Sequence, residues 1–285
     1  MTQIPEWLVK KAQEAEQKTK AKTNSKPKAE VIQLPLWTEI ERAIPNHLAR
    51  SSLFAPIAKG RRKQHRKTPL VSRSDAVILF SGDQLDEADC DVWMQALHEA
   101  RQVPLGEPVQ INRAEFLRKI GRSKSAQAYR WLHSSFERLS FGMLSIQTKT
   151  YEIGVTPHSR LIHLINGFDH DPATDSYMLQ IDPRMLKMFN NAEFALINWE
   201  KRLLIENRVD LAKRLQRLVA TSSDKTQRYS LDYLKEVCCH EGRMRDFKTS
   251  LQDAMEELER LNIIQNPKIE LSTQGKEQAC WNRFK

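Results

Sequence analysis

Glycine is scarce in this sequence of 285 residues, and its placement excludes whole classes of protein. Only nine glycines occur, and each stands alone. Neither the GxGxxG pattern of dinucleotide-binding folds nor the GxxxxGK(S/T) pattern of phosphate-binding loops is present. Because the backbone cradles that hold nucleotide phosphates are missing, we do not expect an ATPase or a dinucleotide-dependent enzyme.

Cysteine and long apolar runs are scarce as well. Cys90, Cys238, Cys239 and Cys280 are too few for a disulfide framework, and Cys238-Cys239-His240 has no second ligand pair at zinc-binding spacing. No segment approaches the ~18 consecutive apolar residues of a membrane-spanning helix, and the N-terminus lacks the apolar core of a signal peptide. We therefore expect a reduced, cytoplasmic protein with no membrane contact, no structural metal and no cofactor.

Catalytic signatures are also missing. The sequence has no HExxH, no GxSxG and no His-apolar-His pair of the kind that nicking initiators combine with a tyrosine. Asp169, Asp171 and Asp175 resemble a calcium loop, but Thr174 and Gln180 occupy the positions at which an EF-hand requires glycine and glutamate. The segment is therefore expected to be a turn, and no enzymatic activity is expected.

Positive charge, in contrast, is concentrated at one end of the chain. Residues 1–74 carry sixteen Lys and Arg against six Glu, a balance of +10, so the remaining residues carry −1 of the total of +9. Residues 59–67 place six Lys or Arg in nine positions. Because a core does not form around such charge density, residues 1–74 are expected to be a flexible basic arm. An arm of this kind favours a polyanionic partner, above all nucleic acid.

Two segments in the remaining chain share one pattern. Residues 115–139, EFLRKIGRSKSAQAYRWLHSSFERL, and 232–258, DYLKEVCCHEGRMRDFKTSLQDAMEEL, each predict a short helix, a turn and a long helix. A hairpin pattern follows both, at 143–155 and around Thr273-Gln274-Gly275. Helix, turn, helix and hairpin form the winged-helix plan. We therefore predict an α+β fold with two tandem winged-helix domains, residues 75–191 and 192–285.

Other periodic segments complete this prediction. Asp83 or Asp86 is expected to cap a helix that ends near Gln102. The remaining predicted elements are strands at 77–80, 108–112, 160–166 and 177–181, and helices at 195–205 and 208–221.

The long helix of the second copy carries the strongest candidates for DNA contact. In a helix-turn-helix, the second helix enters the major groove. Charge along 243–261 changes from basic to acidic, which opposes the helix dipole. A phosphate-lined groove explains that cost, whereas the alternative is a solvated face with incidental charges. The predicted contacts on this helix are Arg243, Arg245, Lys248, Thr249 and Gln252.

Three further groups of basic or polar residues are weaker candidates. The first copy offers base reading, phosphate contact or subunit pairing through Arg122, Lys124, Gln127 and Arg130. The arm offers phosphate contacts through Arg61, Arg62, Lys63, Arg66 and Lys67. Between the copies, a basic helical surface that either holds phosphates or is merely solvated would consist of Lys201, Arg202, Lys213, Arg214 and Arg217.

Tandem winged helices behind a basic arm resemble the Rep-type plasmid replication initiators, specifically the TrfA family of broad-host-range IncP plasmids, over the whole chain. The resemblance implies binding to directly repeated double-stranded origin sites (iterons), opening of an adjacent AT-rich segment, and recruitment of the host replicative helicase with the host initiator. Single-stranded AT-rich DNA is a further candidate partner. It also implies an active monomer and an inactive dimer that pairs through the first winged helix. The chief alternative is a dimeric winged-helix transcription repressor, and the enzymatic alternative is a nicking initiator.

Residues 33–37, QLPLW, are similar to the peptide that such initiators present to the bacterial sliding clamp. The amide of Gln33 would fix the register by hydrogen bonds, while Leu34, Leu36 and Trp37 would supply the apolar contacts. Pro35 pins φ and can hold the peptide extended. The alternative is that Leu36 and Trp37 pack against the first domain.

Overall fold

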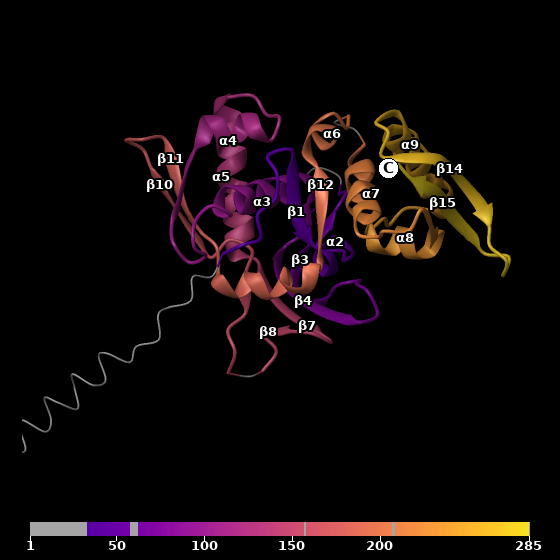
Figure 1. Cartoon of the computed structure of the whole chain (residues 1–285), viewed down its shortest axis with the longest axis horizontal. Coiled ribbons are helices and arrows are strands. Elements are labelled where there is room, and N and C mark those ends of the chain that lie inside the picture. The colour runs from indigo at the N-terminus through magenta and orange to yellow at the C-terminus, as the bar shows by residue number, and fades with distance from the viewer. Residues whose placement is uncertain (1–32, 58–61, 157, 207–208, 285) are drawn as a thin grey trace, which may run out of the picture. The chain divides into compact units, whose positions relative to one another are not determined.

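The computed structural model describes residues 33–57, 62–156, 158–206 and 209–284 (Figure 1). Residues 1–32, which form much of the expected basic arm, lie outside the described residues, as does Arg61. The remaining chain has a mixed α/β architecture.

The predicted helix-turn-helix segments form as expected. Helix α3 (Glu87–Ala100) begins at Asp86, whose carboxylate accepts the backbone N–H of Asp89 at 2.8 Å. Helix α4 (Arg113–Lys119) is followed by α5 (Ala126–Phe141), which Ser125 caps by accepting the N–H of Ala128. In the second half, Ser230 caps α8 (Leu231–Val237) in the same way, and α9 (Met244–Arg260) follows. These caps satisfy backbone donors that the first turn leaves free.

The same order of elements occurs twice. In the first unit, α3, β6 (Val109–Asn112), α4 and α5 precede β10 (Gly167–Asp171) and β11 (Ser176–Gln180), whose sheet has the order β10-β11-β6. The second unit repeats this with α7, β13, α8, α9, β14 and β15, and its sheet has the order β14-β15-β13. The new elements there are α7 (Asp210–Ala220), β13 (Thr226–Ser230), β14 (Ile264–Leu271) and β15 (Glu277–Arg283). In both sheets the last strand lies between the other two.

The first unit contains an additional sheet, and its strands β7, β8 and β9 lie between α5 and β10 in the chain. The hairpin expected at 143–155 is present as β7 (Met143–Thr148) and β8 (Glu152–Ile153), but β7 pairs with β4 rather than with the sheet that contains β6. The hairpin that follows the helices in the repeated plan is β10–β11 instead. The sheet around β7 also contains β3 (Gln64–Pro69), β4 (Ala76–Asp83) and β9 (Ile162–His163).

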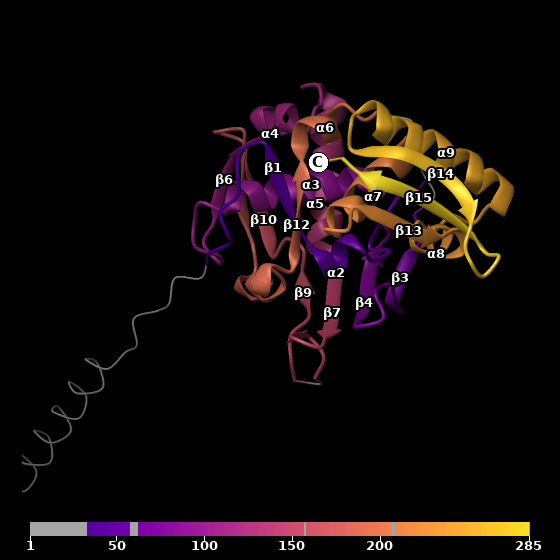
Figure 2. The ribbon, with the colours of Figure 1, turned by 45° about the vertical axis from the view of Figure 1, so that its right-hand side comes forward.

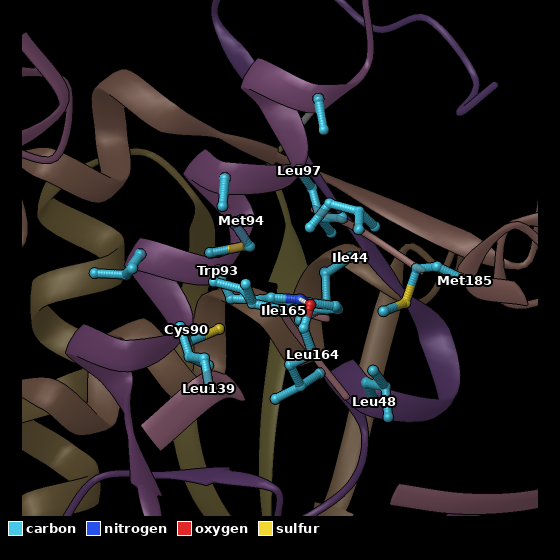
Figure 3. Packing of buried hydrophobic residues seen from close by; sticks show 14 of the residues in the cluster. Ile44, Leu48, Cys90, Trp93, Met94, Leu97, Leu139, Leu164, Ile165 and Met185 are labelled. Atoms are coloured by element: carbon cyan, nitrogen blue, oxygen red, sulfur yellow. Dashed lines mark hydrogen bonds between the residues drawn. The ribbon is translucent and has the colours of Figure 1, made fainter. Parts of the chain in front are cut away.

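The prediction of a flexible arm is wrong for residues 33–57 and 62–74. They contribute β1, which pairs with β12, the short helix α2, β2, which runs parallel to β5, and the edge strand β3. Figure 3 shows Ile44 and Leu48 from this segment packed in the same cluster as Trp93 and Leu97 of α3. The physical reason is that the apolar residues in 33–57 meet partners distant in sequence, while charged side chains on the edge strand β3 remain in water. The bounds are β1 (Glu41–Pro45), α2 (Asn46–Ala49), β2 (Phe54–Ala55), β5 (Leu85–Asp86) and β12 (Phe194–Asn198).

Two separate apolar cores place the division of the chain later than residue 192. The first core extends to Trp199, and the second begins at Ile205. The prediction of a helix at 195–205 is wrong in its first half, because residues there belong to strand β12, which pairs with β1. Helix α6 (Trp199–Leu203) follows this strand. Two 3-10 turns, η1 (Pro183–Met188) and η2 (Asn190–Ala192), lead into β12.

Candidate nucleic-acid interface

The N-terminal end of α9 presents basic side chains to solvent. Phe247 and Leu251 are buried and fix one side of the helix against the second core. Arg243 and Arg245 have side chains that are 74% and 79% exposed. Farther along the outer side, Thr249 and Gln252 are also exposed. Four of the five predicted contacts on α9 therefore lie exposed on a rigid helix.

The two exposed arginines share one counter-ion. The carboxylate of Asp246 lies 3.0 Å from Nε of Arg243 and 3.6 Å from Nε of Arg245. Exposed ion pairs of this kind are each worth about 0–1 kcal/mol. An incoming phosphate or a guanine edge can therefore replace Asp246 at small cost.

Lys248, the fifth predicted contact on α9, is held differently. Its ammonium Nζ lies 2.5 Å from the Glu277 carboxylate of β15, and its side chain is only 32% exposed. The pair connects the helix to the β14–β15 hairpin and neutralises the lysine. Lys248 thus fixes the hairpin beside α9, and its charge is less available to DNA than that of Arg245.

In the first unit, the predicted contacts lie around the start of α5. Lys124, Gln127 and Arg130 are exposed. The guanidinium of Arg122 stacks over the ring of Trp131, 3.5 Å from its centroid. This cation–π contact covers the Trp131 ring on the flank of α5.

A groove of about 510 Å³ lies beside these residues, between α5 and the β10–β11 hairpin. The guanidinium of Arg113 lies 4.5 Å from the Tyr129 ring and 5.5 Å from the Tyr177 ring, and its Nη1 is 2.6 Å from Nε2 of His170. His133 also lines the groove. Sequence reasoning missed this cluster, because Arg113 and Tyr177 are 64 positions apart and meet only through pairing of β6 with β11.

The tip of the β10–β11 hairpin is acidic. Asp169, Asp171 and Asp175 lie on or beside its turn, and hydrogen bonds from the Thr174 hydroxyl and the Ala173 N–H lower the pKa of Asp171. The prediction that this segment is a turn holds for residues 172–175, whereas Asp169 and Asp171 lie in strand β10 and pair with β11. A hairpin tip that carries stable negative charge is repelled by a phosphate backbone.

A family model described as TrfA protein matches residues 3–270 of this chain. The chain belongs to the TrfA family. It is 24% identical over 272 residues to the plasmid replication initiator protein TrfA of Escherichia coli, a match that covers 92% of this chain and 69% of that protein. Its structure is similar to the crystal structure of domains 2 and 3 of RctB, with a TM-score of 0.52, 13% identity, and coverage of 85% of this chain and 99% of that one. At this identity the likeness to RctB shows a shared fold.

In this member of the TrfA family, some basic residues before Pro69 form ion pairs within the protein, and others are exposed to solvent. Arg62 is not a free phosphate contact, because it pairs with Asp86 and, at 2.8 Å, with the buried Asp89. Lys63 pairs with Glu241, which precedes α9. Arg66 and Lys67 are exposed on β3. Of the described arm residues, Arg66 and Lys67 stay candidates for phosphate contact.

The prediction of a basic surface between the two halves is also wrong for its three arginines. Arg202, Arg214 and Arg217 have no exposed side-chain surface. Arg202 and Arg217 share Glu87 of α3, which is itself buried. Arg214 and Arg217 also donate to backbone carbonyls of α2 and β2. Arg202 on α6 and Arg217 on α7 thus belong to a buried ion-pair cluster that joins the two units. A count of charges along the sequence does not distinguish such a cluster from a solvated face.

Residues 33–37 are part of the first core rather than a free peptide. Leu34 and Trp37 are only 2% and 7% exposed, whereas Leu36 is 76% exposed. The Gln33 side-chain amide donates to the carbonyl of Arg101 at 2.9 Å. Trp37 stacks on Phe189, with ring centroids 6.2 Å apart. The packing alternative therefore holds for Trp37, and Leu36 alone remains available to a partner.

Thiol and metal chemistry find little support among the described residues. Burial raises the pKa of the Cys238 thiol to about 12. Within that part of the chain no three His, Cys, Asp or Glu side chains form a group that could hold a metal ion. No helix there is both long and apolar enough to cross a membrane.

Proposed function

We propose that this chain is a plasmid replication initiator that binds repeated duplex sites, or iterons, at its origin. Membership of the TrfA family and the similarity to the E. coli plasmid replication initiator support this proposal. The observation that carries it is the exposed pair Arg243 and Arg245 on a helix whose opposite face is fixed by a core. We further propose that the protein works without catalytic activity, cofactor or metal, in the cytoplasm.

The two units are proposed to be winged-helix domains. Each has a helix, a strand, a helix-turn-helix and a hairpin, with the last strand central in the sheet. In a winged-helix domain with this order of elements, the second helix of each pair, α5 or α9, is the one proposed to meet DNA. The RctB fragment, which comprises domains 2 and 3 of that protein, is consistent with a two-domain arrangement.

The second unit is the better candidate for reading duplex DNA. Its helix α9 begins with two exposed arginines, each able to donate two hydrogen bonds to O6 and N7 of guanine. The corresponding face of the first unit lies next to the acidic β10–β11 tip, which carries Asp171 and Asp175. We assign base reading to α9, and either subunit pairing or weaker phosphate contact to α5.

Later steps of initiation are proposed from the family alone. They comprise opening of an AT-rich segment with contact to its single strand, recruitment of the host helicase and host initiator, and a balance between monomer and dimer. Binding to the sliding clamp through residues 33–37 stays a prediction. For that binding, Leu34 and Trp37 would have to leave buried sites, at a cost of about 1.5–3 kcal/mol for each large apolar side chain exposed.

Footprinting on the origin of the plasmid that encodes the chain, combined with permanganate probing of unpaired thymines, tests the proposal. An initiator protects several repeats and exposes thymines in the adjacent AT-rich segment. A dimeric repressor protects its operator but leaves the duplex closed, and a nicking initiator leaves a covalent protein–DNA adduct. Protection of no origin sequence would refute the proposal.

A further inference from the structure

Leu271, the last residue of β14, is unusually exposed for a large apolar side chain. It is 67% exposed and stands directly before the turn that joins β14 to β15. An isolated exposed leucine needs no explanation by itself. The exposure of Leu271 does call for an explanation, because of its orientation, its neighbours and the residue at its place in the first unit.

The side chain of Leu271 lies on the face of the hairpin that is turned toward α9. Side chains two positions apart on a strand share a face, and Ile269 packs against the second core. Leu271 is paired with Glu277, and Glu277 binds Lys248 of α9 at 2.5 Å. Leu271 therefore continues the core-facing row of β14 beyond the point where the core ends.

The hairpin turn and the basic end of α9 lie at the same end of the second unit. Strand β14 follows α9 in the chain and runs back along it, so the turn comes to lie near the start of the helix (Figure 2). Arg243 and Arg245 are exposed at that start. A duplex held by the two arginines would have the Leu271 side of the hairpin beside it.

Charge on this hairpin permits close approach to phosphates. Its turn, residues 272–276, contains no carboxylate and includes an exposed Lys276. The two flanking carboxylates are paired, Glu277 with Lys248 and Glu270 with Lys268 at 2.7 Å. In the first unit, the residue that ends the equivalent strand β10 is Asp171, and its turn contains Asp175, which pairs with Arg113 at 3.1 Å. The two hairpins have the same place in the topology, but only the turn of the second contains no carboxylate.

We propose that the β14–β15 hairpin enters the minor groove beside the α9 site and that Leu271 inserts there as an apolar wedge between two base pairs. The proposal rests on the proposed binding of duplex DNA by the second unit. Apolar side chains inserted from the minor groove partly unstack a base step and kink the duplex by about 20–90°. Pyrimidine–purine steps such as TA unstack most easily, so the wedge also favours such a step at a position that no hydrogen bond reads.

The test uses the duplex protected in the origin footprint, with 2-aminopurine at single positions on the hairpin side of the α9 contacts. Unstacking of the probe raises its fluorescence, and end-label energy transfer reports the bend. The wild-type chain is expected to raise fluorescence at one step and to bend the duplex. Leu271→Ser should lose both signals at saturating protein. Leu204→Ser, at a leucine 63% exposed between the two cores, is the matched control and should keep both.

Two results would overturn the inference. One is a Leu271→Ser variant that retains the wild-type fluorescence profile and bend angle, and the other is a wild-type complex in which no probe position is unstacked. Failure of the wild-type chain to protect any origin duplex would instead refute the proposed function, so the two failures are distinguishable. Because Leu271 lies at the surface, its replacement is not expected to unfold the second unit.

Discussion

The indole N–H of Trp37 donates to Nδ1 of His98 at 3.0 Å, and both side chains are buried. On its other side, the His98 ring lies 2.9 Å from Oε2 of Glu39. His98 therefore accepts at Nδ1 and donates at Nε2, which is the neutral form of the imidazole. The contact fixes residues 33–39 on the C-terminal end of α3.

Replacement of Trp37 should therefore lower the stability of the first unit. Trp37→Ala is expected to lower the free energy of unfolding by about 3–5 kcal/mol, because it removes a buried aromatic side chain. Leu36→Ala, at the exposed neighbour, should change it by no more than about 0.5 kcal/mol. Urea denaturation of both variants measures the difference. Equal, small effects would mean that residues 33–37 are a free peptide after all.

Stability should also fall in mild acid through His98. Burial, with the nearby positive charge of Arg42, lowers the pKa of His98 to about 4. The unfolded chain binds a proton near pH 6.5 while the folded chain does not, so this contribution is complete above pH 6.5 and is lost as pH falls toward 4. The loss amounts to at most about 3 kcal/mol. Melting temperatures of the wild type and His98→Gln between pH 7 and 4.5 check this, and the same slope for both would contradict it.

The sequence predicts the repeated helices well because their signals are local. Ser125 and Ser230 each stand one residue before an apolar helical pattern, and both cap the expected helix. The prediction for residues 33–57 fails because their signals are not local. Their partners, such as β12 for β1 and His98 for Trp37, lie about 60 to 150 positions away, and no local pattern reveals them.

For the candidate site too, local features could be predicted from the sequence and contacts between distant residues could not. Exposure of Arg243 and Arg245 follows from the apolar stripe of α9, which the sequence displays. The burial of Arg202 and Arg217 depends on Glu87, which is more than 100 positions away on α3. A count of charges identifies a basic helix but does not show whether its partner is a phosphate or a buried carboxylate.

Removal of that buried carboxylate should therefore strongly destabilise the protein. Glu87→Ala leaves Arg202 without one partner and Arg217 without its carboxylate, and is expected to destabilise the protein by about 3–5 kcal/mol. Lys201 lies on the same helix as Arg202, is only partly buried, and donates to the carbonyl of Asn262 rather than to a carboxylate. Lys201→Ala should therefore cost less than about 1 kcal/mol. Thermal unfolding measures both. Equal effects would show that the cluster does not join the two units energetically.

The basic stretch around β3 allows a matched comparison of two roles. Arg62→Ala should destabilise the first unit by about 1.5–3 kcal/mol, because its guanidinium binds Asp86 and Asp89. Lys67→Ala should leave stability unchanged and, if Lys67 contacts a phosphate, lower the salt dependence of specific and nonspecific binding alike by ~0.9. Unfolding curves and salt titrations separate these outcomes. A variant of Arg62 that loses DNA binding without loss of stability would contradict the assignment.

The central claim is that α9 reads bases through its exposed arginines, and Arg245→Ala tests it most directly. The measurement is a salt titration of wild type and variant on the footprinted repeat and on a scrambled duplex of the same length. The account predicts a loss of about 1–3 kcal/mol on the repeat with little change on the scrambled duplex. An equal loss on both duplexes would contradict it, since α9 would then only grip phosphates, and base reading would have to lie elsewhere, with α5 the next candidate.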